Sequence, residues 1–145
     1  MLSVKRLRPG ALLPRRATPG SAGYDLFACL EEPLAIPAGE TRLVPTGIAI
    51  DVGDPQLGAF IFARSGIAVK HGVAPANCVG VVDSDYRGEL TVGLHNHSQD
   101  EYVIQPGERV AQMILMPVAL PELAECDELS QTQRGAGGFG STGKN

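Results

Sequence analysis

Long apolar runs are missing from this chain of 145 residues. No stretch approaches the ~18 consecutive apolar residues that a membrane span needs. The first eight residues are basic, but they lack the apolar stretch and the small-residue cleavage site of a signal peptide. We therefore expect the protein in the cytoplasm.

Cysteine and positive charge are also scarce. The three cysteines, Cys29, Cys78 and Cys126, are far apart and odd in number, so the sequence suggests neither a disulfide framework nor a Cys-x-x-Cys metal site. A formal net charge of −4 argues against broad, sequence-independent nucleic-acid binding. A small anionic ligand remains compatible with this charge, because local arginines, backbone N–H groups and a metal ion can outweigh it.

Glycine and proline are abundant, with 18 and 11 residues respectively, and they interrupt any long helix. Short runs rich in Val, Ile and Leu lie between them, which is typical of an all-β sandwich, barrel or jelly-roll-like domain. The length suits one domain that buries roughly 70% of its unfolded surface. We expect one helical turn at residues 67–71 and strands at residues 4–7, 24–28, 34–36, 41–45, 47–51, 59–63, 73–82, 90–94, 102–104 and 109–116.

The most informative stretch is residues 80–90, where an apolar run enters a compact acidic turn and a second apolar run follows. This pattern predicts a strand, a tight polar corner that holds Asp83 and Asp85, and another strand. The corner is either a solvated hairpin tip or a site that positions water or a metal. It resembles the start of a calcium loop, but the twelfth position is Leu94 instead of Glu, so we reject that interpretation.

Other polar residues interrupt the apolar pattern. Arg64-Ser65-Gly66 ends a strand and is either a simple turn or a phosphate site that offers a guanidinium, a hydroxyl and a backbone N–H. Gln112 is a polar exception in the most apolar strand. His95 and His97 share a face at strand period but have no third ligand nearby, so surface histidines are favoured over a metal site.

The end of the chain is half glycine. Residues 138–144 match the first seven positions of a phosphate-binding P-loop, but Asn145 replaces the required Ser or Thr and no helix follows, so we reject a P-loop. Clustered backbone N–H groups and Arg134 remain suited to binding an anion. We expect residues 134–145 to be a mobile tail unless something binds it, although Phe139 is unusual in such a polar segment.

These segments together closely resemble the five motifs of the trimeric deoxyuridine triphosphatases (dUTP pyrophosphatases), in order and over nearly the whole chain. The motifs are residues 22–26 (Ala-Gly-Tyr-Asp-Leu), 64–66 (Arg-Ser-Gly), 80–88 (Gly-Val-Val-Asp-Ser-Asp-Tyr-Arg-Gly), 106–112 (Pro-Gly-Glu-Arg-Val-Ala-Gln) and 134–143 (Arg-Gly-Ala-Gly-Gly-Phe-Gly-Ser-Thr-Gly). The resemblance implies a jelly-roll-like subunit, a homotrimer whose three active sites are each built from all three chains, and Mg²⁺-dependent hydrolysis of dUTP to dUMP and pyrophosphate. It divides the chain into a β domain, residues 1–133, and a lid, residues 134–145.

The resemblance also implies roles for individual residues. Asp83 is the expected general base that orients water for attack on the α-phosphorus, and Asp25 reaches Mg²⁺ through water while the triphosphate carries most of the ion. Asp85 is expected to brace the turn, against Arg87 or a neighbouring subunit. The expected substrate contacts are Asn77, Val81, Val82 and Asp83 for uracil in a narrow hairpin, Tyr86 for deoxyribose, Arg64, Ser65, Gly66 and Gln112 for phosphates, and Arg134, Phe139, Gly140 and Ser141 for the closing tail.

Two other functions remain to be compared with this one. A deoxycytidine triphosphate deaminase of the same fold needs an acid/base beside the ring, whereas Asp83 on the motif pattern is aimed at the phosphate. A non-catalytic β-rich nucleotide-binding module is the other alternative, although no motif residue is missing.

Overall fold

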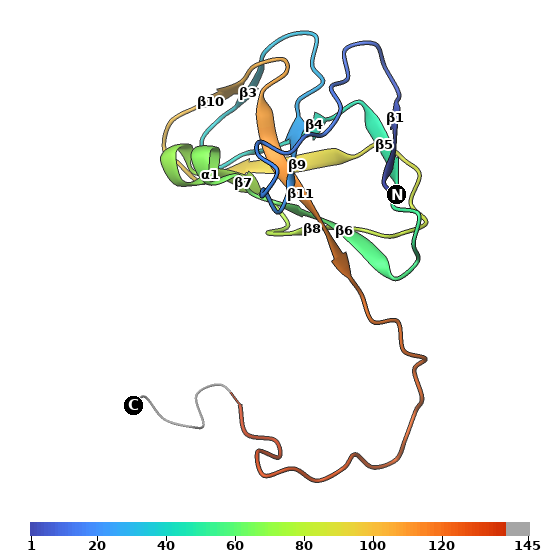
Figure 1. Ribbon diagram of the computed structural model, residues 1–145. Coiled ribbons are helices and arrows are strands. Elements are labelled where there is room, and N and C mark those ends of the chain that lie inside the picture. The colour runs from blue at the N-terminus through green and yellow to red at the C-terminus, as the bar shows by residue number, and fades with distance from the viewer. Residues whose placement is uncertain (139–145) are drawn as a thin grey trace.

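The computed structural model describes residues 1–138, which form eleven strands and one short helix (Figure 1). This confirms the predicted all-β class. The elements are β1 (Ser3–Arg6), β2 (Tyr24–Phe27), β3 (Leu34–Ile36), β4 (Thr41–Pro45), β5 (Ile48–Asp51), β6 (Leu57–Phe62), α1 (Ser65–His71), β7 (Val73–Pro75), β8 (Gly80–Val82), β9 (Thr91–Asn96), β10 (Tyr102–Ile104) and β11 (Arg109–Pro117).

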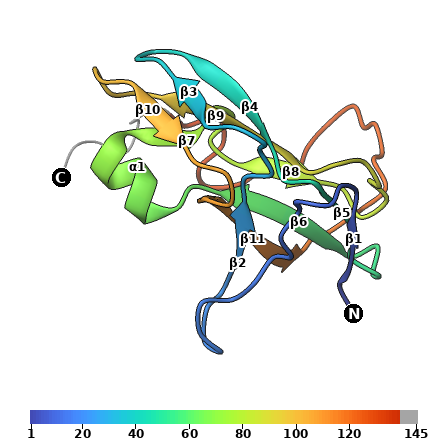
Figure 2. The same ribbon diagram turned by 90° about the horizontal axis from the view of Figure 1, so that it is seen from above.

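The strands form a jelly-roll-like sandwich instead of a closed barrel (Figures 1 and 2). A four-stranded antiparallel sheet has the order β2-β11-β6-β8, and a three-stranded sheet has the order β4-β9-β7. The antiparallel pairs β1-β5 and β10-β3 complete the body. Buried side chains from both larger sheets share one core, including Leu26 and Met113 from the first and Val44 and Leu94 from the second.

Strand β11 supplies the centre of the larger sheet because its inward side chains are apolar and well buried. Val110, Ala111 and Met113 are fully buried, as the apolar pattern of residues 109–116 predicts. A register irregularity between Arg109 and Ala111 interrupts the pairing with β2. Gln112 lies beside Asp25 of β2 and Phe62 of β6, so this polar residue is held at the middle of the sheet.

The predicted strand at residues 73–82 is wrong in one respect, because the chain turns within it. Strands β7 and β8 are separated by a turn in which the Cys78 amide donates to the Pro75 carbonyl at 3.0 Å. Cys78 has φ of 63°, a left-handed conformation that ends an extended run. An apolar sequence pattern carries no signal for this conformation.

The acidic corner also differs from a hairpin tip. Strand β8 pairs with β6, while β9 pairs with β4 and β7, so the strands on either side of the corner belong to different sheets. The chain from 83 to 90 therefore crosses from one sheet to the other. A space remains between the two sheets at this crossing.

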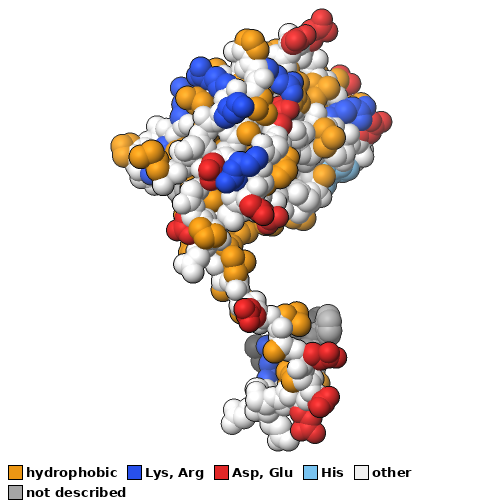
Figure 3. All heavy atoms as spheres, turned by 90° about the vertical axis from the view of Figure 1, so that its right-hand side faces the viewer, with side chains coloured by type: hydrophobic (Ala, Val, Ile, Leu, Met, Phe, Trp, Pro, Cys, Tyr) orange, Lys and Arg blue, Asp and Glu red, His pale blue; other side chains and the backbone are white. Residues whose placement is uncertain are grey.

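After β11 the chain extends away from the body as an arm (Figure 1). Residues 119–136 are exposed, including Leu123 at 95% and Leu129 at 86%. Four acids occur between 122 and 128, and Figure 3 shows acidic side chains along the arm. Within residues 1–138, no helix has the length and apolar character needed to span a bilayer.

Candidate active site

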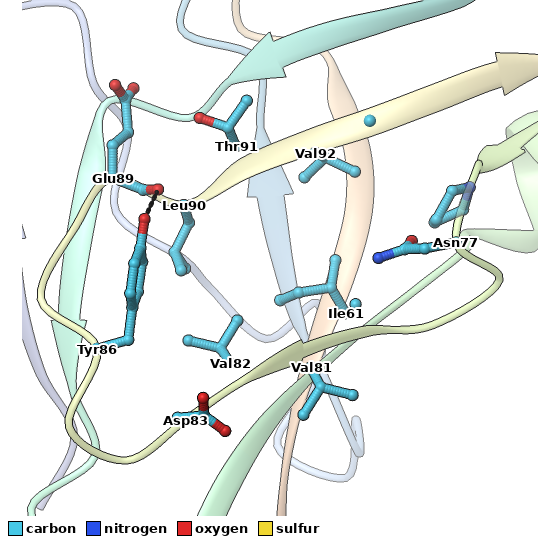
Figure 4. A pocket seen from close by; sticks show the side chains of 13 residues that line it. Ile61, Asn77, Val81, Val82, Asp83, Tyr86, Glu89, Leu90, Thr91 and Val92 are labelled. Carbon is cyan, nitrogen blue, oxygen red and sulfur yellow. Dashed lines mark hydrogen bonds between the residues drawn. The ribbon is translucent and has the colours of Figure 1, made fainter.

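A cavity of about 310 Å³ lies at the acidic corner, between β8 and the start of β9 (Figure 4). It contains the predicted base-binding and catalytic residues of this corner together with others that the sequence did not single out. Its lining residues are Ile61, Pro75, Asn77, Gly80, Val81, Val82, Asp83, Tyr86, Glu89, Leu90, Thr91, Val92 and Gly93.

The backbone of β8 is available to a ligand because β8 is the edge strand of its sheet. An edge strand has one row of N–H and C=O groups without strand partners. Gly80 allows the close packing that places this edge beside the cavity, since a Cβ there would lie 3.1 Å from the Ile61 Cβ and 3.6 Å from Asn77 Nδ2. The cavity thus combines backbone donors and acceptors with the Asn77 amide, which suits a planar base that offers both.

Asp83 lies exposed at the cavity, at the first position of a turn in which its carbonyl accepts from the Tyr86 amide at 3.1 Å. None of the described side chains forms a hydrogen bond or ion pair with its carboxylate, which leaves both oxygens available to a water molecule. Asp85 is exposed as well, but Arg87 pairs with Asp51 at 2.9 Å instead of with Asp85. The expected contact between Asp85 and Arg87 is therefore wrong, and the alternative contact of Asp85 with a neighbouring subunit stays a prediction.

Tyr86 forms one side wall of the cavity. Its hydroxyl donates to the Glu89 carbonyl at 3.1 Å, as Figure 4 shows, and its ring folds back over Gly88. A Cβ at Gly88 would overlap this ring. The Tyr-Arg-Gly sequence is therefore a steric requirement of the wall.

A second cavity of about 270 Å³ contains the predicted metal-associated residue and the predicted phosphate-binding residues except Gly66, which is not part of its lining. It is lined by Ala17, Ser21, Ala22, Gly23, Asp25, Arg64, Ser65 and Gln112. Ser65 and Gly66 are exposed in the first turn of α1. This cavity is suited to binding an anion, because it offers the guanidinium of Arg64, the hydroxyl of Ser65 and the side-chain amide of Gln112.

Asp25 is the centre of this second cavity. It is 8% exposed, and its carboxylate accepts from Arg64 Nε at 2.8 Å and from Arg109 Nη1 at 3.2 Å. Arg64 also donates through Nη1 to the Arg109 carbonyl at 3.3 Å. Arg109 is not among the predicted site residues, although a charged residue at the start of the apolar run 109–116 is a signal for such a role. One buried acid thus orients two guanidinium groups.

Gln112 is fixed from two sides. Its Nε2 donates to the Ala63 carbonyl at 2.9 Å, and a Cβ at Gly23 would lie 3.1 Å from its Oε1. Glycine at position 23 therefore lets this amide pack closely between β2 and β6. Gln112 lines the same cavity as Asp25 and Arg64.

The turn before β11 is locked by Glu108. Its carboxylate accepts from the Tyr102 hydroxyl and from the Gln105 amide, the latter at 2.9 Å. Burial, then the hydrogen bond to Glu108 and its negative charge, raises the pKa of Tyr102 to about 12. The tyrosine is therefore a neutral donor at physiological pH, and it holds the turn that delivers Arg109 to Asp25.

The structure does not bring all predicted site residues into one cavity. Asp83, Asn77, Val81, Val82 and Tyr86 line the first, whereas Asp25, Arg64, Ser65 and Gln112 line the second, and the two cavities share no lining residue. Arg134 lies in the arm, where its Nε donates to the Gly137 carbonyl at 2.8 Å. Phe139, Gly140 and Ser141 lie outside the described residues.

A metal held by protein ligands alone finds no support in residues 1–138, where no group of three or more His, Cys, Asp or Glu side chains converges. Asp25 is the single carboxylate of the second cavity, and both its oxygens already accept from arginine. Mg²⁺ keeps several of its waters and accepts few protein carboxylates. The donor set therefore fits an ion carried by a ligand's phosphates and touched by Asp25 through water.

Replacing Asp25 with Asn is expected to lower the free energy of unfolding by about 2–3 kcal/mol, because the amide carries no charge and its NH₂ group would face one of the two arginines. Urea titration at one protein concentration measures the change. Glu40→Gln is the matched control: the Arg42–Glu40 pair is 2.6 Å long but exposed, so its loss is expected to stay within about 1 kcal/mol. Equal losses in the two variants would contradict the anchoring role of Asp25.

Comparison with known proteins gives consistent matches. A family model described as dUTPase matches residues 10–143. The deoxyuridine 5'-triphosphate nucleotidohydrolase of Burkholderia multivorans is 50% identical over 143 residues, covering 99% of this chain and 97% of that relative. The protein of the same name from Paraburkholderia xenovorans is 52% identical over 132 residues, covering 91% and 89%. A structure of Staphylococcus bacteriophage 80alpha dUTPase with dUPNHPP superimposes with a TM-score of 0.89 at 27% identity, covering 99% of each chain.

Proposed function

This chain belongs to the dUTPase family, and we propose that it hydrolyses dUTP to dUMP and pyrophosphate by attack of water on the α-phosphorus. The observation that carries the proposal is the cavity at the edge of β8, where backbone groups, the Asn77 amide and the Asp83 carboxylate line one space. The reaction lowers dUTP and supplies dUMP for dTMP synthesis. We expect it in the cytoplasm.

In this proposal the first cavity binds the nucleoside. Uracil pairs with the backbone of residues 81–83 and with Asn77, and the narrow space excludes the methyl group of thymine. A steric limit is effective here because attraction to one methyl group contributes only ~1–3 kcal/mol. Tyr86 packs against the deoxyribose and leaves no room for a 2′-hydroxyl. Asp83 orients the water and accepts its proton as the water attacks.

The second cavity binds the triphosphate in this proposal. Arg64, Ser65, Gly66 and Gln112 hold phosphate oxygens, and the Asp25–Arg64 contact keeps the guanidinium in a fixed orientation before substrate arrives. Preorganised donors of this kind stabilise charge that develops during the reaction. Asp25 would contact a Mg²⁺ ion through water, and the ion would neutralise charge on the triphosphate that carries it.

A homotrimer accounts for the separation of the two cavities. In one chain the nucleoside half and the phosphate half line separate cavities with no common residue, which supports a site that takes its second half from a neighbouring copy. The exposed arm after Pro117 extends away from its own body, so it could reach an active site formed by two other copies of the chain. We propose that residues 1–133 form the β domain and that residues 134–145 close over the substrate, with Phe139 stacking on uracil and Arg134, Gly140 and Ser141 on the phosphates.

Incubation of the purified protein with dUTP and with dCTP, with and without EDTA, tests the proposal. We expect Mg²⁺-dependent release of pyrophosphate from dUTP and no ammonia from dCTP. Ammonia release would support a deaminase instead, and nucleotide binding without turnover would support a binding module. A solution mass near three times the 15.2 kDa chain mass is expected in the same preparation, and a monomeric mass with full activity would contradict the shared site.

A further inference from the structure

Tyr86 stands at the sugar side of the first cavity, with its backbone held in the turn that begins at Asp83. Its side chain is among the exposed large ones, at 46%, and within residues 1–138 its hydroxyl forms one hydrogen bond, to the Glu89 carbonyl. A wall that excludes a 2′-hydroxyl by size works only if it does not move. The contacts that fix Glu89 therefore determine how well this wall separates deoxyribose from ribose.

Glu89 is fixed from two directions by residues outside the five motifs. Its Oε1 accepts from the Gly47 amide at 2.7 Å, and its Oε2 pairs with Arg8 Nη2 at 2.6 Å. Figure 4 shows the Glu89 side chain directed away from the cavity, while its carbonyl faces the Tyr86 hydroxyl. The side chain thus fastens the backbone that holds the tyrosine.

The Gly47 end of this anchor is rigid. Gly47 has φ of 70°, and a Cβ there would lie 2.7 Å from Cys29 Sγ, so no other residue fits. The neighbouring residue of the same segment is held as well, because the Leu90 amide donates to the Ile48 carbonyl at 2.9 Å and the Thr46 amide donates to the Leu90 carbonyl at 3.1 Å. A movement of Glu89 must therefore break contacts to the turn before β5.

Two ion pairs connect this segment to earlier parts of the chain: Glu89 pairs with Arg8, which follows β1, and Arg87 pairs with Asp51 at the end of β5. Their solvent exposure shows which pair is the stronger. The side chains of Glu89 and Arg8 are 22% and 46% exposed, whereas those of Asp51 and Arg87 are 46% and 52% exposed. Exposed pairs are screened by water and salt and contribute little. Glu89 with Arg8 is accordingly the stronger of the two anchors.

We propose that Glu89, held by Arg8 and the Gly47 amide, is a positioning residue that fixes Tyr86 and thereby sets the discrimination between deoxyribonucleoside and ribonucleoside triphosphates. The inference rests on the proposed function, in which Tyr86 lies against the sugar. Glu89 acts through Tyr86 and takes no part in the chemical step. Its loss is expected to admit UTP without greatly slowing turnover of dUTP.

The test measures kcat and KM with dUTP and with UTP for Glu89→Ala, Glu89→Gln and Arg8→Met. We expect the ratio of kcat/KM for dUTP over UTP to fall about fivefold to tenfold in Glu89→Ala, since two hydrogen bonds are lost, with kcat for dUTP within about twofold. Glu89→Gln and Arg8→Met each lose one contact and should show smaller decreases of the same sign. Arg8 is 46% exposed, so Arg8→Met remains informative if Glu89→Ala does not fold.

Arg42→Met is the matched control, because it breaks the Arg42–Glu40 ion pair, which has the same 2.6 Å length and lies on β4. Its dUTP:UTP ratio is expected to equal that of the wild type. A lowered thermal midpoint in the Glu89 variants with an unaltered ratio would overturn the inference and leave Glu89 a role in stability only. If the wild type releases pyrophosphate from dUTP and all variants keep its dUTP:UTP ratio of kcat/KM, this inference alone is overturned. If the wild type releases no pyrophosphate from dUTP, the proposed function is overturned first.

Discussion

Asp83→Asn is expected to lower kcat for dUTP by about 10²–10⁴-fold, the usual loss when a positioned general base is removed. The affinity for dUTP should stay within a few-fold, because the backbone of β8, Asn77 and Tyr86 remain in place around the cavity. Asn is similar in size to Asp and still accepts one hydrogen bond, but it cannot take a proton from water. Pyrophosphate release measures kcat, and calorimetry with dUPNHPP measures binding.

Asp85→Asn is the matched control for this change. Asp85 lies two residues further along the same exposed turn, and Arg87, its expected partner, is engaged by Asp51. We expect Asp85→Asn to retain nearly full kcat. Substantial turnover in Asp83→Asn would contradict the role of Asp83 as general base. An equal loss of kcat in Asp85→Asn would show that the turn contributes only its negative charge.

The sequence predicts most strands because their signals are local. Short runs with apolar residues, bounded by turns that contain proline and glycine, place β3, β4 and β10 at the residues expected. The turn between β7 and β8 was missed because a left-handed Cys78 leaves no mark in an apolar run. The pairing of β8 with β6 instead of β9 was also out of reach, since a tight polar corner resembles a hairpin whether or not its strands pair.

The site was predictable as a set of residues but not as an arrangement. The motifs name Asp25, Arg64 and Gln112, and the structure places them in one cavity. They cannot reveal that Asp25 holds Arg109, 84 positions away, or that Arg8 holds Glu89, 81 positions away. Contacts of this kind depend on which strands become neighbours, and single-residue spacing carries no information on that.

Truncation after Gln133 is the second change for which we expect a large effect. The deleted segment carries Arg134 and Phe139, and in the proposed lid these add charge-assisted bonds of ~1.5–3 kcal/mol and base stacking of ~1–3 kcal/mol. The loss of both is expected to lower kcat/KM for dUTP by roughly two orders of magnitude or more.

The body should be unaffected by this truncation, because residues 119–133 are already exposed and the core lies within residues 11–113. The thermal midpoint and the solution mass are therefore expected to match those of the full chain. Deletion of Lys144 and Asn145 alone is the control, since both follow the last motif residue, and it should leave kcat/KM unchanged. Phe139→Ala should give an intermediate loss if stacking contributes separately. An unaltered kcat/KM after truncation at Gln133 would contradict the lid. Ordering a glycine-rich segment costs more backbone entropy than ordering any other, so the proposed lid closes only where its contacts with bound substrate offset that cost. The loss of such contacts must lower kcat/KM.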